Sequence, residues 1–123
     1  MISGIVTTNR EAVIRLIVSG PQGQTQEVDA IIDTGFDGFL TLPSGLIAAL
    51  SLPWRRRGRA MLADGSDSLF DVHEATVVWD GTPRRIAVDS VDIDPLIGMT
   101  LLDGHELTIQ VAVGGRVTIL PLP

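Results

Sequence analysis

The sequence predicts a mainly β fold in one domain that spans residues 1–123. Short apolar, β-branched segments recur along the chain with partial alternation, and glycine-containing turns separate them. A chain of this length has room for one hydrophobic core and little more. The number and spacing of the segments are typical of a small barrel or sandwich.

The expected strands and their connections follow one another along the chain. Segments with strand character are residues 12–18, 27–33, 75–79, 84–91, 106–113 and 116–122. The connections at 19–24, 79–83 and 113–116 contain Gly or Asp-Gly, which supply the positive φ angles of tight turns. Each connection is therefore expected to close a hairpin.

Two short helices are expected between the strands. In 43–52, apolar residues recur at helical spacing, and Ser44 is a candidate N-cap. The segment 99–104 is expected to form a second short helix that ends at Gly104.

Composition restricts the classes of function. The chain contains no cysteine, which excludes disulfides, thiolate metal ligands and a cysteine nucleophile. Its net charge is −6, and we expect no nucleic acid partner because phosphate binding usually needs a basic face. The arginines of residues 54–59 are candidates for phosphate contact, but we favour a solvated arginine face.

The sequence also indicates where the protein is found. No stretch approaches the ~20 apolar residues that span a bilayer, so we expect no membrane partner. Residues 1–13 show no basic leader followed by an apolar run. Together with the absence of cysteine, these features favour a cytoplasmic protein.

The stretch IIDTGFDG at 31–38 carries the strongest chemical signal. Asp33 follows an apolar segment, so its carboxylate is expected at or near the core, where a charge needs a partner or a function. The alternative is a β-turn in which Asp33 bonds its own backbone and Gly35 takes a positive φ. The apolar context favours the functional interpretation.

In this stretch the sequence resembles the retropepsin-like aspartic proteases. The resemblance lies in Asp33-Thr34-Gly35 with Asp37 and Gly38 after it, in Ala63-Asp64-Gly65-Ser66, and in LIGMTLL at 96–102. These elements stand in the family's order, and with the strands between them the resemblance covers residues 10–120. It implies a closed β-barrel of the acid-protease fold with one or two short helices.

The resemblance implies an aspartic endopeptidase that acts on a peptide or protein substrate without a cofactor. In this family two aspartates share one proton: the ionised carboxylate activates a water, and the protonated carboxyl donates to the scissile carbonyl. The chain contains only one Asp-Thr-Gly. Each active site would therefore take one Asp33 from each subunit of a homodimer.

The resemblance also implies roles for the residues that support Asp33. Thr34 would hydrogen-bond across the dyad into the partner's loop. Gly35 would let the backbone approach closely and present its N–H. Ile97 and Gly98 would pack behind the Asp33 loop, with the second helix supporting it.

Substrate contacts are implied for two further segments. Asp37 and Gly38 follow the catalytic motif, and residues 61–70 are in the place of the family's flap, a hairpin that closes over bound peptide. Within the flap, Ala63, Asp64, Gly65 and Ser66 would contact substrate.

Two positions depart from the viral members of the family. The flap segment has one glycine and carries Asp64, so it lacks their glycine-rich tip. Met99 stands where viral members have an arginine that engages the carboxylate corresponding to Asp37. Asp37 is therefore left without its expected ion-pair partner.

Other interpretations stay open at this level. A non-catalytic peptide-binding or dimerisation module would keep the fold without turnover, although the intact Asp-Thr-Gly favours the enzyme. An intrachain carboxylate pair of Asp33 and Asp37 is a further alternative. A metal site would need the His-Glu pairs at 73–74 and 105–106, but such dipeptides arise readily by chance, and we expect no metal.

Overall fold

The computed structural model describes residues 1–123, and its fold is mainly β, as predicted. The strands are β1 (Ile2–Val6), β2 (Ala12–Ser19), β3 (Thr25–Ile32), β4 (Leu40–Leu42), β5 (Trp54–Met61), β6 (Asp67–Trp79), β7 (Thr82–Ser90), β8 (Leu96–Ile97), β9 (His105–Ile109) and β10 (Arg116–Pro121). The helices are α1 (Ser44–Ala49) and α2 (Met99–Leu102). No helix has the length and apolar character needed to span a membrane.

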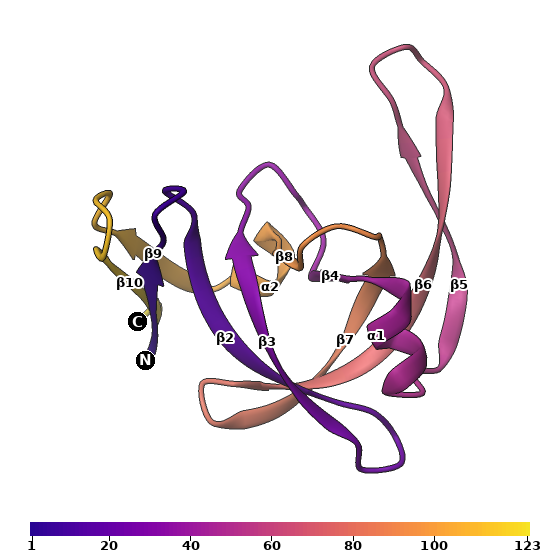
Figure 1. Cartoon of the computed structure of the whole chain (residues 1–123), viewed down its shortest axis with the longest axis horizontal. Helices are drawn as coiled ribbons and strands as arrows, with labels where there is room; N and C mark the ends of the chain where they lie inside the picture. Colours follow the sequence, from indigo (N-terminus) through magenta and orange to yellow (C-terminus); the bar gives the residue numbers. More distant parts are fainter.

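The strands form one sheet in the order β5-β6-β7-β4-β8-β3-β2-β1-β10-β9. An additional antiparallel pairing joins β6 to β2, with Val18 opposite Val77. The pairings therefore return on themselves through six strands, β2, β3, β8, β4, β7 and β6. The closed barrel expected from the sequence stays a prediction. Figure 1 shows β9, β10 and both termini at the opposite side of the molecule from the β5–β6 hairpin.

The hydrophobic core follows from the alternation of side chains along the strands. In β2, Ile14, Leu16 and Val18 are buried, whereas Arg15 and Ile17 between them are exposed, as a strand with one covered face requires. Buried aliphatic side chains also come from β3, β4, β6, β7, β8, β10 and both helices. Ala30 of β3 and Ile97 of β8 belong to this core, and Ile32 packs against it. The candidate site lies where these two strands end.

Most of the expected elements are confirmed, and two expectations are wrong. The expected strand at 106–113 ends at Ile109, because residues 110–115 form the turn to β10, with Gly114 at a φ of +80°. Ser44 is not the N-cap of α1: that position is Pro43, and no side chain caps the helix.

Ser44 has a different partner. Its backbone N–H and its hydroxyl both donate to Asp92 Oδ1, each at 2.8 Å. Asp92 belongs to the loop between β7 and β8, so these bonds tie that loop to the start of α1. The N–H and hydroxyl of Ser44 hold the pKa of Asp92 below its usual range, because they stabilise the ionised carboxylate.

We predict that Asp92→Ala lowers the thermal midpoint near neutral pH. A carboxyl whose pKa is lowered in the folded state stabilises it above the unfolded pKa, about 3.9 for aspartate. This stabilisation is lost as the pH falls through the lowered folded pKa. Thermal unfolding of both proteins across this range should give a difference that shrinks towards acid pH; a constant difference would contradict the ionic origin.

Candidate active site

Parallel pairing of two short segments places Asp33. Ile31 and Ile32 at the end of β3 lie opposite Leu96 and Ile97 of β8. The Asp33 N–H then donates to the Ile97 carbonyl at 2.9 Å, which continues the pairing by one residue. In Figure 1 the loop that follows β3 lies on the same side of the molecule as the tip of the β5–β6 hairpin.

Backbone hydrogen bonds fasten the rest of this loop to the start of α2. Gly98 N donates to Phe39 O at 3.1 Å, and Met99 N donates to Phe36 O at 2.8 Å. Thr100 N donates to the Gly38 carbonyl at 3.1 Å. The loop 36–39 is therefore held by main-chain groups of 98–100.

Two glycines make room for an aromatic ring in this arrangement. A Cβ atom at Gly38 would lie 2.5 Å from Cζ of Phe36, and one at Gly98 would lie 2.7 Å from Cδ2 of the same ring. A Cβ at Gly98 would also lie 2.2 Å from the Gly38 carbonyl oxygen. Larger residues at these positions would separate the loop from α2.

The Asp33 carboxylate is only half-buried, and one of its oxygens is used locally. Oδ1 accepts the Gly35 N–H at 2.9 Å, so the Asx-turn weighed above is present. Gly35 itself does not have a positive φ. Oδ2 has no hydrogen-bond partner in the chain, and Thr34 and Gly35 are exposed. A carboxyl group with a free oxygen next to an exposed turn is able to accept a proton from water when it is ionised and to donate one when it is protonated.

Asp37 lies further along the same loop and has a different environment. Its side chain is exposed and makes no ion pair or hydrogen bond. Thr100 Oγ1 donates to its backbone carbonyl, which fixes the main chain and leaves the carboxylate free. Met99, which follows Gly98, is 49% exposed.

A cleft of about 800 Å³ lies between the β5–β6 hairpin and the body of the molecule. Its walls come from the Asp33 loop, β4, both strands of the hairpin, β7 with the loop after it, and β8. Phe36, Leu69, Ile93 and Leu96 are among its apolar lining residues. The lining of the cleft is thus mostly apolar, and its first residue along the chain, Phe36, comes three residues after Asp33.

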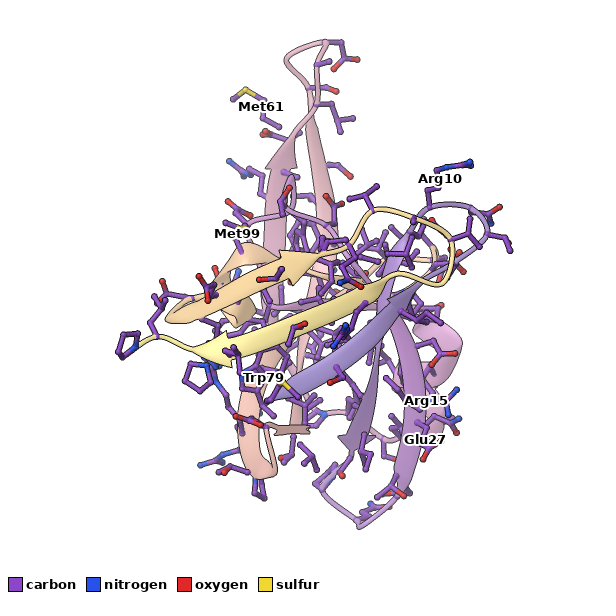
Figure 2. All side chains as sticks on the ribbon, turned by 90° about the vertical axis from the view of Figure 1, so that its left-hand side faces the viewer. Arg10, Arg15, Glu27, Met61, Trp79 and Met99 are labelled. Carbon is purple, nitrogen blue, oxygen red and sulfur yellow. The ribbon has the colours of Figure 1, made fainter.

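The expected flap is a hairpin whose tip stands in solvent. Gly65 has a φ of +85°, and the Leu62 N–H donates to the Ser66 carbonyl at 2.8 Å. Ala63, Asp64, Gly65 and Ser66 are exposed and do not line the cleft, whereas Met61 and Leu62 beside them do. Figure 2 shows Met61 near the tip, beyond the bulk of the molecule.

The turn of this hairpin has its own hydrogen bonds. Asp64 Oδ1 accepts the Ser66 hydroxyl at 2.5 Å and the Ser66 N–H at 2.9 Å. The Ser66 hydroxyl, and to a smaller extent the Ser66 N–H, hold the pKa of Asp64 below its usual range. Asp64 therefore shapes the turn of the hairpin.

Asp89 is a cleft residue that sequence reasoning missed. It lies on β7, opposite Thr41 of β4 and Val72 of β6, both of which are buried. Its half-buried carboxylate has no hydrogen bond or ion pair. Burial raises the pKa of Asp89, and the charge of Asp37 adds to this, whereas Arg56 opposes it. The available signal was a lone acidic residue within the apolar strand RIAVDS.

The other candidate groups lie elsewhere. Arg55, Arg57 and Arg59 are exposed and paired with carboxylates of β6, in agreement with a solvated arginine face. His73 Nδ1 lies 2.9 Å from the Leu52 carbonyl oxygen, and His105 Nε2 accepts the Trp79 indole N–H at 3.2 Å. No three His, Asp or Glu side chains gather as ligands for a metal.

Comparison with solved structures identifies a similar fold. EIAV protease in complex with the inhibitor HBY-793 matches with a TM-score of 0.53 and 14% sequence identity. The match covers 77% of this chain and 88% of the chain of EIAV protease. No family model and no curated protein matches the sequence. The chain therefore has a retropepsin-like fold.

We predict that Gly98→Ala destabilises the protein and loosens the Asp33 loop. The added methyl group would meet the Gly38 carbonyl oxygen at 2.2 Å, and overpacking of this kind costs about 1–3 kcal/mol. Chemical denaturation measures the stability, and hydrogen exchange of the Thr100 amide reports the loop.

Gly45→Ala is the matched control. Gly45 lies in α1, and a Cβ there would meet nothing within 4 Å. Alanine favours a helix over glycine by about 0.5–1 kcal/mol, so this variant should be as stable as the original or more stable. Equal losses in both variants would contradict the role assigned to Gly98.

Proposed function

We propose that the protein is an aspartic endopeptidase in which Asp33 is the catalytic residue. The main support for this proposal is the position of Asp33. It follows a strand, its backbone N–H binds β8, and one of its carboxylate oxygens is free. The loop that carries it continues into the wall of the large cleft. A retropepsin-like fold supports the same conclusion.

The proposed reaction needs a second carboxyl group. One Asp33 acts as the base on a water molecule, and a protonated Asp33 of the partner subunit donates to the carbonyl oxygen of the scissile peptide bond. The chain contains one Asp-Thr-Gly, so a homodimer supplies the pair. Exposure of Thr34 and Gly35 leaves this turn free to contact a second copy.

The remaining roles complete the proposal. Ile97 and Gly98 support the Asp33 loop, and the hairpin of residues 61–70 closes over the bound peptide. In the open arrangement Ala63 to Ser66 stand away from the cleft, so closure would bring them and Met61 towards substrate. A single domain, the closed barrel and a cytoplasmic location stay predictions.

We predict that Asp33→Asn abolishes peptide hydrolysis while the protein remains folded. An amide has nearly the shape of the carboxyl group but accepts no proton at neutral pH, and loss of a general base lowers rates by about 10²–10⁴-fold. The measurement is cleavage of a mixed peptide library by wild type and variant at equal concentration.

Asp103→Asn is the control, because Asp103 is exposed at the end of α2 and its carboxylate makes no ion pair or hydrogen bond. It should cleave at the wild-type rate. Unchanged turnover in Asp33→Asn would refute the proposal. Peptide binding by wild type without any cleavage would instead indicate a non-catalytic peptide-binding module.

A further inference from the structure

The cleft contains two carboxylates that have no partner. Its charged lining residues are Asp37, Asp89, Asp92 and Arg59. Asp92 accepts hydrogen bonds from the N–H and the hydroxyl of Ser44, and Arg59 Nε lies 3.5 Å from Asp67 Oδ2. Only Asp37 and Asp89 therefore remain without an ion pair or a hydrogen bond.

Asp89 is a half-buried lining residue of the cleft. Its neighbours across the sheet, Thr41 and Val72, are 3% and 1% exposed. The position of a Cβ atom at Gly38 is 3.5 Å from Asp89 Oδ2, an ordinary contact distance, so the Asp33 loop lies beside this carboxylate. Asp89 thus lies beside the main chain that precedes β4 and follows Asp37.

No cation of the chain occupies this position. Arg56 on β5 is close enough to influence Asp89, but it forms no ion pair with it and lines a separate hollow with Arg55 and Arg85. A half-buried carboxylate without a partner destabilises the folded protein unless something else compensates for its burial. A bound cationic group would provide that compensation.

We propose that Asp89, assisted by Asp37, selects a lysine or arginine side chain of the bound peptide. The inference rests on the proposed function, since it assumes that a peptide occupies the cleft. Apolar residues such as Leu69, Ile93 and Leu96 line the same space and suit the aliphatic stem of such a side chain. The carboxylates then receive its charged end.

The test uses pairs of peptides that differ only by lysine or norleucine at one position near the cleavage site. Norleucine keeps the aliphatic stem and removes the charge. Wild type should cleave the lysine peptide with a kcat/KM about tenfold higher at one position, which is the size of one charge-assisted hydrogen bond. Asp89→Asn should lose this preference, and Asp89→Glu should keep part of it. An unchanged preference in Asp89→Asn would overturn the inference.

Two further measurements separate the possible failures. Asp103→Asn, which removes a carboxylate outside the cleft, should keep the lysine preference. Binding of the same labelled peptides to each protein is measured by fluorescence anisotropy. If wild type cleaves no peptide, the proposed function fails; an Asp89-dependent preference for lysine in binding would still support this inference, and its absence would overturn it.

Thermal unfolding of Asp89→Asn distinguishes selection from a structural role. The pKa of Asp89 is raised in the folded state, so stability falls as the pH rises from the ordinary carboxyl range through the raised value. The variant should therefore have a higher thermal midpoint than wild type near neutral pH, with a smaller difference below a pH of about 3.9. A lower midpoint at neutral pH would show that Asp89 stabilises the fold and would overturn the inference.

Discussion

The parallel pairing of β3 with β8 is the constraint on which the candidate site depends. It aligns Ile32 with Ile97, and the next hydrogen bond, from the Asp33 N–H, fixes the proposed catalytic residue. A shift of one residue would turn every side chain of β3 to the other face of the sheet. Main-chain groups of residues 98–100 and the Thr100 hydroxyl also bind the loop, so the Asp33 carboxylate does not have to hold the loop in place alone.

The cleft beside this loop combines apolar walls with more negative than positive charge, since Asp37, Asp89 and Asp92 line it with a single cation, Arg59. Two other carboxylates that line the cleft are each stabilised in a different way. Asp92 accepts hydrogen bonds from Ser44, and Asp37 is exposed to solvent. Asp89 has neither advantage, since it is half-buried and has no partner. Strain or lost stability of this kind is typical of positions kept for binding. The apolar walls and the charge of the cleft are the basis of our proposal that it binds a peptide with a basic side chain.

Sequence patterns predicted the parts of the molecule that local rules control. Alternation predicted β2, β3, β7, β10 and parts of β6 and β9, and glycine turns predicted the hairpins that connect them, whereas β1, β4, β5 and β8 were not predicted. The hairpin at Gly65 was expected from the resemblance. Ser44 failed as a cap because its partner, Asp92, is 48 residues away, and no local rule includes such a contact. Asp89 was missed for the same reason: only the register of β7 between β4 and β6 shows that it reaches the cleft. Asp33 was found because its motif is contiguous.

The origin of the second catalytic carboxylate is tested most directly by mixing subunits. Equal amounts of wild type and Asp33→Asn are refolded together, with subunit exchange confirmed by a mass-tagged variant. If each site takes one Asp33 from each chain, random pairing leaves both carboxylates in about one dimer in four, and activity per total protein should fall to about a quarter of the wild-type value. Activity of about half, with exchange demonstrated, would place the whole site within one chain and contradict the shared pair.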